Sequence, residues 1–171
     1  MAMIVQNHVP RHNLIFIVED DEMYSFMLEY SLSEEHKLRC LRFEKGEECI
    51  NNLPLDPDMI ILDYVLPGIN GLETFRRIKS SKPDVPVMVL TSNFDSGAAQ
   101  KFMDEGVYDY LLKEDDAMSR VKSAVVSIIE KKSREHEIKQ EKDGMLGIAR
   151  MVLLFLILFA LLGTAFWLVI A

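Results

Sequence analysis

Charged and hydroxyl side chains follow four short apolar runs of this sequence, each placed directly after a run ends. Glu19 and Asp20 follow the first run, Asp63 the second, Thr91 the third and Lys113 the fourth. Carboxylate oxygens are ligands that Mg²⁺ prefers, and a lysine ammonium binds phosphoryl oxygens as a point charge. If the four runs end at one place, the sequence predicts a site for a metal ion and a phosphoryl group.

The apolar runs are typical of strands that are buried on both faces of a sheet. Each is four to six residues long, and they cover residues 14–18, 59–62, 85–90 and 108–112. Such strands belong to parallel sheets with helices on either side. Because ligands bind at the carboxyl ends of the strands in open α/β sheets, we expect the polar residues to share one crevice.

Helical periodicity between the runs completes an alternation of five strands and five helices. Residues 38–43 predict a further, more polar strand nearer a sheet edge, and residues 47–53 predict a short helix that stops at Pro54. The helix after the first strand is expected to pack through apolar residues spaced i, i+3, i+4 and i+7. These residues are Met23, Phe26, Met27 and Tyr30. The alternation predicts right-handed βαβ units and a parallel sheet.

The C-terminal end has the composition of a membrane-spanning helix. Residues 151–171 carry no charge, and 21 helical residues span about 30 Å, one hydrocarbon core. Basic residues precede this segment, so the positive-inside rule places the preceding domain in the cytoplasm. We expect residues 1–13 to be a mobile tail and 14–130 the folded domain. Residues 131–150 would be a charged linker, either a solvated helix or a flexible connector, and 151–171 a single-pass anchor in the inner (cytoplasmic) membrane.

Acidic residues outnumber basic ones in this chain. It has 27 Asp and Glu against 19 Lys and Arg, a net charge of −8. Domains that bind nucleic acid carry a basic stripe that neutralises phosphates, and the sequence has no such stripe. Nucleic acid is therefore not expected as a partner.

The order of these residues resembles that of the receiver domain of response regulators, the CheY-like family. The resemblance rests on Val18-Glu19-Asp20-Asp21, on Asp63 followed by Pro67-Gly68 and Gly71, on Thr91-Ser92, and on Tyr110 three residues before Lys113. It covers about residues 14–130 and implies a flavodoxin-like fold, a doubly wound (βα)5 parallel sheet with the strand order 2-1-3-4-5. The C-terminal transmembrane helix would follow this fold.

The resemblance also implies a role for each residue of the predicted site. Asp63 would be the phosphoacceptor, Thr91 and Lys113 would bind the phosphoryl oxygens, and Tyr110 would be the aromatic switch residue. Mg²⁺ would be held by Glu19, Asp20, Asp63 and the backbone carbonyl of Val65. A carboxylate that attacks a phosphohistidine needs its own charge and the phosphoryl charge neutralised, which Mg²⁺ and a lysine supply.

One position departs from the family pattern, because Lys113 is followed by Glu114 where the family usually has proline after a cis bond. A cis bond before a non-proline residue costs about 2.5 to 4 kcal/mol, which favours a trans bond and a different placement of Lys113. This departure leaves an alternative open, a phosphorylation-independent adaptor that docks partners at the membrane. A haloacid-dehalogenase-like phosphatase is a third class, but it needs a second aspartate where this chain has Val65.

The predicted function is that of a membrane-anchored receiver in a two-component phosphorelay. A sensor histidine kinase or a phosphotransfer protein would donate the phosphoryl group, and the chain would signal by contacts with a downstream protein. It would not be an enzyme with a separate substrate, because it catalyses only its own phosphorylation and dephosphorylation. Ala160 and Thr164 form a small-xxx-small pair through which two anchors could make a homodimer.

Overall fold

A parallel sheet forms the centre of the fold. The computed structural model describes residues 13–36, 38–92 and 95–170. For residues 34–36, 136 and 155–170 it describes the backbone but not the side chains. Within these residues, five parallel strands pair in the order β2-β1-β3-β4-β5, which confirms the predicted flavodoxin-like topology. The strands are β1 (Leu14–Val18), β2 (Arg39–Phe43), β3 (Met59–Asp63), β4 (Val87–Thr91) and β5 (Asp109–Leu112).

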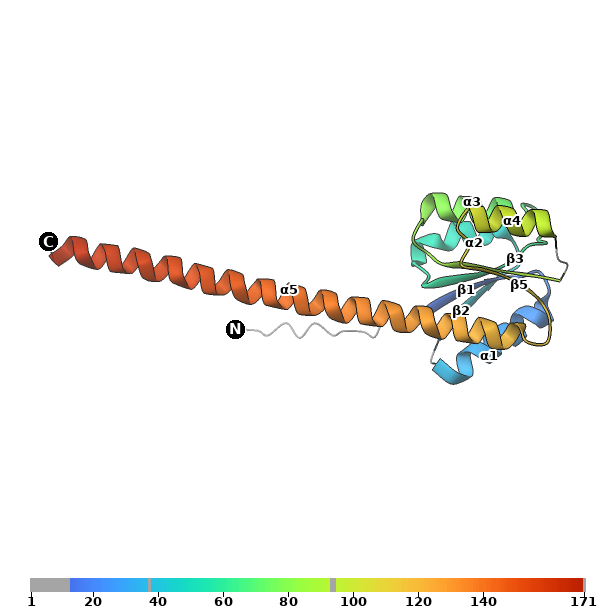
Figure 1. Cartoon of the computed structure of the whole chain (residues 1–171), viewed down its shortest axis with the longest axis horizontal. Coiled ribbons are helices and arrows are strands. Elements are labelled where there is room, and N and C mark those ends of the chain that lie inside the picture. Colours follow the sequence, from blue (N-terminus) through green and yellow to red (C-terminus); the bar gives the residue numbers. More distant parts are fainter. Residues whose placement is uncertain (1–12, 37, 93–94, 171) are drawn as a thin grey trace. The chain divides into compact units, whose positions relative to one another are not determined.

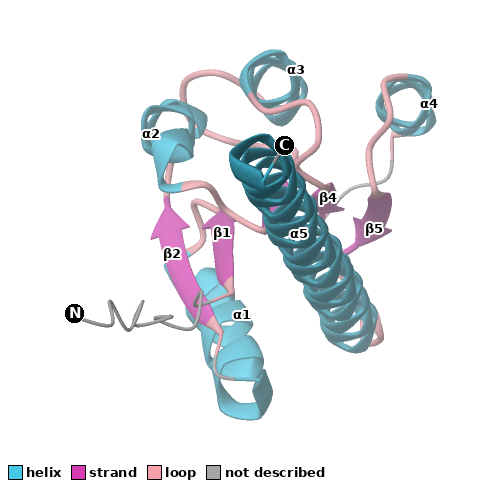
Figure 2. Ribbon diagram, turned by 90° about the vertical axis from the view of Figure 1, so that its left-hand side faces the viewer, coloured by secondary structure: helices cyan, strands magenta, loops and turns pink. Residues whose placement is uncertain are grey.

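Helices cover both faces of this sheet (Figure 1). One face is covered by α2 (Gly46–Asn52), α3 (Gly71–Ser81) and α4 (Ser96–Asp104). The other is covered by α1 (Glu22–His36) and the first part of α5 (Ala117–Ile170). Figure 2 shows the same two layers from another side.

The core consists of two apolar clusters, one on each face of the sheet. Phe16 and Val18 of β1 point to the cluster that includes Phe75 of α3, whereas Ile15 and Ile17 point to the opposite one. Successive side chains of a strand point to opposite faces, so a strand covered on both sides must be apolar throughout. This explains why β1, β3 and β4 are buried along their whole length.

The face of α1 predicted to be buried is exposed, and this prediction is wrong. The four side chains concerned are all at least half exposed: Met23, Phe26, Met27 and Tyr30. The helix instead buries Ser25, Leu28 and Leu32. Apolar residues lie on two faces of α1, and periodicity alone does not say which one meets the sheet. In the structure, Leu28 and Leu32 pack into the apolar cluster on this face of the sheet. Arg42 of β2 also pairs with Glu29 at 2.8 Å and donates to Ser25 at 3.3 Å.

β2 and β5 each start one residue later than predicted, at Arg39 and Asp109. Two further elements differ from the predictions without moving the site. The run 85–90 predicts a strand that starts at Val85, but β4 starts at Val87, after Pro86, which has no N–H to give to the ladder. The helix predicted over 47–53 is α2, which begins one residue earlier and is followed by a 3₁₀ turn, η1 (Leu53–Leu55). Both differences lie away from the carboxyl ends of the strands.

The chain divides into two compact units, Met1–Ile129 and Glu130–Ala171. In the first unit, Val121 and Val125 of α5 are buried against the sheet. Across the described residues, no helix combines the length and the apolar character needed to cross a membrane. The predicted anchor covers 151–171, whose side chains from residue 155 onward lie outside the described residues, so it stays a prediction. The predicted tail, 1–13, also lies outside them except for its last residue.

Candidate functional site

The register of the sheet brings the predicted site residues to one edge. Val18 of β1 pairs with Leu62 of β3, and the residues that follow this pair are Glu19 and Asp63. In the same way, Leu112 of β5 pairs with Thr91, the last residue of β4, and Lys113 follows Leu112. The side chains therefore gather at the carboxyl ends of the strands, where open α/β sheets bind ligands.

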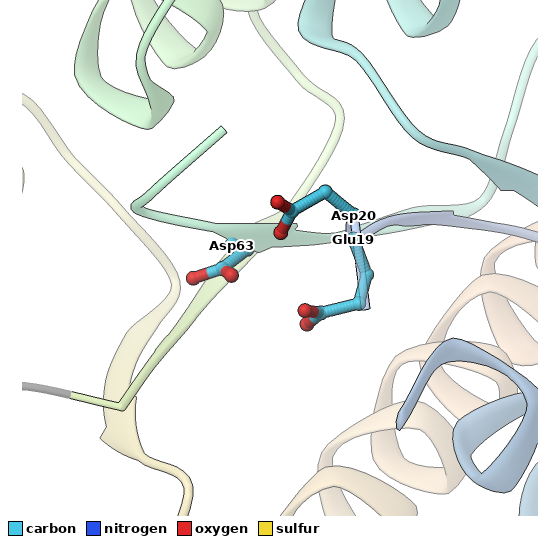
Figure 3. Close-up of side chains that lie close together, drawn as sticks. All are labelled: Glu19, Asp20 and Asp63. Atoms are coloured by element: carbon cyan, nitrogen blue, oxygen red, sulfur yellow. The ribbon is translucent and has the colours of Figure 1, made fainter. Parts of the chain in front are cut away.

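Three carboxylates converge at this edge from the ends of β1 and β3 (Figure 3). Oxygen atoms of Glu19, Asp20 and Asp63 lie within 4.8 Å of one another. Glu19 and Asp63 are 3% and 5% exposed, whereas Asp20 is open to solvent. Like charges this close repel one another, and positive charge placed among them relieves the repulsion.

Lys113 supplies one positive charge from the end of β5. Its Nζ donates to Glu19 at 2.8 Å and to Asp63 Oδ2 at 2.9 Å. The described residues contain no cis peptide bond, so the bond from Lys113 to Glu114 is trans, as the departure from the family pattern favoured. The trans bond does not carry Lys113 away from the site. Its backbone N–H donates to the carbonyl of Thr91 at 2.8 Å, which holds it at the end of the sheet.

Burial and charge change the acidity of two groups in the site. Burial raises the pKa of Glu19 to about 7; the hydrogen bond from Lys113 opposes this and the charge of Asp63 adds to it. Burial lowers the pKa of Lys113, but its hydrogen bonds to Glu19 and Asp63 outweigh burial and raise the pKa overall. Lys113 is therefore charged at neutral pH, while Glu19 holds a proton more readily than an ordinary glutamate does.

The oxygen atoms of the site suit a hard divalent cation. With all three carboxylates ionised, they and the one ammonium would leave two negative charges, which an ion such as Mg²⁺ would cancel. Glu19, Asp20 and Asp63 would hold it. Val65, predicted to offer its carbonyl, has its backbone next to Asp63, because its N–H donates to Asp63 Oδ1 at 3.3 Å. The residues present thus fit the predicted ion.

A pocket of about 570 Å³ opens the site to solvent. The described residues that line it are Glu19, Asp20, Asp21, Tyr24, Asp63, Val65, Ser92 and Lys113. Sequence reasoning missed Tyr24, because the wrong choice of buried face on α1 drew attention to other residues. Tyr24 lies in the first turn of α1, just after the residues Glu19 and Asp20 that follow β1. This nearness in sequence was the signal that could have found it.

Thr91 and Tyr110 are buried and are not among the residues that line the pocket. Thr91 is fully buried, and Tyr110 is 9% exposed. The Tyr110 ring packs against Phe102 of α4, with ring centroids 5.7 Å apart. Burial is the main cause that raises the pKa of Tyr110, so its hydroxyl stays protonated at neutral pH. The phosphoryl-binding role of Thr91 and the switch role of Tyr110 stay predictions.

Gly71 allows α3 to start directly against the end of β3. A Cβ atom at this position would lie 2.5 Å from the carbonyl oxygen of Asp63 and 2.7 Å from the Cα of Tyr64. Both are backbone atoms, so the chain could not give way cheaply. Asn70 caps the helix, since its side chain accepts from the N–H of Glu73 at 2.9 Å. The glycine thus keeps the loop after Asp63 close to the site.

The comparison with known sequence families agrees with this geometry. Residues 15–125 match the family described as response regulator receiver domain. The match covers more than half of the chain, so the chain belongs to the response regulator receiver family, a class of signalling modules of two-component systems.

Curated relatives belong to the same class. The chain is 31% identical over 144 residues to the DNA-binding transcriptional regulator NtrC of Salmonella typhimurium, covering 81% of this chain and 30% of that protein. It is 32% identical over 99 residues to the response regulator ArlR of Staphylococcus haemolyticus, covering 58% of this chain and 45% of that protein. The chain thus spans less than half the length of these relatives.

Solved structures of receivers have the same fold. The phosphorylated cyanobacterial phytochrome response regulator RcpA matches with a TM-score of 0.59 and 26% identity, over 68% of this chain and 91% of that chain. The BeF3-activated receiver domain of DrrB matches with a TM-score of 0.59 and 26% identity, over 70% of this chain and 98% of that chain.

Proposed function

We propose that Asp63 receives a phosphoryl group from a histidine kinase or a phosphotransfer protein, with Mg²⁺ held at the same site. The placement of the Asp63 carboxylate carries this proposal. It accepts a hydrogen bond from Lys113 at 2.9 Å, lies within 4.8 Å of the oxygens of Glu19 and Asp20, and faces an open pocket. The similar regulator RcpA is known in a phosphorylated form, which supports the proposal.

In the proposed reaction, an oxygen of Asp63 attacks the phosphorus of a phosphohistidine. The P–N bond breaks as the P–O bond of an acyl phosphate forms, and the imidazole that leaves takes up a proton. Lys113 would turn from the carboxylate to a phosphoryl oxygen, with Thr91 as a further donor. Mg²⁺, when bound by Glu19, Asp20, Asp63 and the carbonyl of Val65, supplies charge that neutralises the reacting groups.

The proposed output is a change of surface that a downstream protein recognises. A phosphoryl group on Asp63 offers acceptors to Thr91, and the movement of Thr91 would change the space beside Tyr110. Tyr110 contacts Phe102 of α4, so a shift of the Tyr110 ring would change its packing against that helix. The chain would then act through protein contacts and catalyse only its own phosphorylation and dephosphorylation.

The C-terminal segment supports a further part of the proposal, that the receiver is tethered to the cytoplasmic membrane. Residues 151–171 are uncharged, and basic residues of 131–150 precede them. A tether would confine the receiver to the surface where a membrane kinase lies and raise their effective concentration. The pair Ala160 and Thr164 would let two such anchors meet.

The comparisons do not support the exclusion of nucleic acid that the acidic composition suggested. NtrC is named as a DNA-binding regulator, although this chain covers only 30% of its length. We keep protein contacts as the proposed output because the chain carries a net charge of −8.

The alternative function is an adaptor that is never phosphorylated, and Glu114 in place of proline is the feature that keeps it open. This departure was expected to displace Lys113. Lys113 nevertheless contacts both Glu19 and Asp63.

Phosphate labelling separates the two functions. The full chain, in a mild detergent, is incubated with acetyl phosphate and Mg²⁺, and its intact mass is measured. We expect the mass of one phosphoryl group in the wild type, none in Asp63→Asn, and wild-type labelling in Asp115→Asn, which changes an exposed aspartate outside the pocket. Labelling of Asp63→Asn would reject Asp63 as the acceptor, and a wild type that takes up no phosphate would favour the adaptor.

A further inference from the structure

Tyr24 covers one side of the Lys113 ammonium group in the candidate site. The Lys113 Nζ lies 4.7 Å from the centroid of the Tyr24 ring, while it donates to Glu19 and Asp63. The negative face of an aromatic ring attracts a cation at this distance. The ammonium is thus held by two carboxylates and one ring.

The first turn of α1 fixes the place of the ring. The backbone N–H of Tyr24 donates to the carboxylate of Asp21 at 3.0 Å. Tyr24 is half-buried and lines the same pocket as Asp63 and Lys113. The ring therefore belongs to the wall of the site, although it offers no ligand to a metal ion.

The backbone of Lys113 is held at the end of the sheet, but contacts of its flexible side chain decide where the ammonium group lies. Its side chain has four flexible carbons, and the three residues that follow, Glu114, Asp115 and Asp116, are all exposed. Even so, the Lys113 side chain is only 10% exposed. The surface that closes over it includes the Tyr24 ring.

We propose that Tyr24 is a positioning residue, whose ring keeps the Lys113 ammonium within reach of the phosphoryl oxygens. This inference rests on the proposed function of Asp63. When a phosphoryl group arrives, Lys113 must exchange a carboxylate partner for a phosphoryl oxygen. Attraction to the ring does not depend on which oxygen Lys113 contacts, so it can hold the ammonium in place throughout the exchange.

The test compares variants with and without an aromatic face at this position. The rate of labelling by acetyl phosphate at saturating Mg²⁺ is measured on the full chain in mild detergent. Tyr24→Leu is expected to slow labelling by about three- to thirty-fold, the range that a partly desolvated cation–π contact allows. Tyr24→Phe keeps the ring and is expected to stay within about two-fold of the wild type. Tyr30→Leu, on the same helix but outside the pocket, is the matched control.

A spectroscopic readout tests the contact independently of phosphorylation. The ring current of Tyr24 should move the NMR signals of the Lys113 ε-methylene protons upfield in the wild type and in Tyr24→Phe, but not in Tyr24→Leu. Circular dichroism and the unfolding midpoint check that the variants fold. If Tyr24→Leu does not fold, Tyr24→Met, which also lacks a ring, takes its place.

Either of two results would overturn the inference. One is a Tyr24→Leu variant that is labelled as fast as the wild type, or a Tyr24→Phe variant as slow as Tyr24→Leu. The other is a Lys113 signal that does not respond to loss of the ring. A wild type that is not labelled at all would count against the proposed function of Asp63, and the NMR comparison would still decide whether Tyr24 positions Lys113.

Discussion

The Glu19 carboxyl is less acidic than an ordinary glutamate. Burial raises its pKa to about 7 from the ordinary value of 4.5, so it keeps a proton up to a higher pH than an ordinary glutamate does. Mg²⁺ binds the ionised carboxylate, and the ion and the proton therefore compete.

The consequence is a pH-dependent affinity for Mg²⁺. Because the pKa is raised, Glu19 gains its proton as the pH falls through about 7, and the affinity should fall by up to about tenfold per pH unit below that point. Isothermal titration calorimetry between about pH 8 and about pH 6 measures this. Glu19→Gln should bind more weakly and lose the dependence. A wild-type affinity that is constant over this range would contradict the assigned role of Glu19.

Residues that follow buried strands could be predicted from the sequence, whereas a residue on a helix could not. Glu19, Asp63 and Lys113 each come one position after an apolar run, and the carboxyl ends of parallel strands share an edge. Tyr24 reaches the site only because α1 turns Leu28 toward the sheet. That orientation depends on packing against the sheet, which local sequence does not reveal.

The orientation of α1 can be tested by comparing substitutions on its buried and exposed faces. Leu28 is fully buried, whereas its neighbour Met27 is 50% exposed. Leu28→Ala should lower the free energy of unfolding by about 2–5 kcal/mol, because it removes buried apolar surface and leaves a cavity. Met27→Ala should cost less than about 1 kcal/mol, since most of what it removes already faces water. Urea denaturation followed by circular dichroism measures both, and a larger loss in Met27→Ala would favour the orientation that periodicity suggested.

Strands were easier to predict than helix faces for a physical reason. A strand covered on both sides is apolar at every position, so β1 and β3 stand out whichever way they face. A helix is apolar on part of its circumference, and α1 has large apolar residues on the exposed face as well. The sheet order followed from the family resemblance rather than from any single strand.

The two compact units of the chain differ in composition and in content. The first unit, Met1–Ile129, contains the packed sheet and its helices, and the second, Glu130–Ala171, contains the uncharged segment. Composition alone reveals the uncharged segment within the second unit, because 21 consecutive uncharged residues stand out without any knowledge of packing.

The proposed tether predicts where the chain is found after cell lysis. The full chain should sediment with membranes and stay there in alkaline carbonate, because transfer of the apolar segment to water is unfavourable. A chain that lacks residues 151–171 should remain in the supernatant and still be labelled by acetyl phosphate. Immunoblotting of the two fractions measures this. A full chain that carbonate releases would rule out a spanning anchor.

The location of the phosphoryl group decides whether the site works as proposed. After labelling with acetyl phosphate and Mg²⁺, borohydride reduction converts a phosphorylated aspartate to homoserine, which peptide mass spectrometry can locate. The predicted result is homoserine at position 63 and at no other aspartate. Homoserine at Asp20 or Asp21 with none at Asp63, or no reduction product when Mg²⁺ is present, would contradict it.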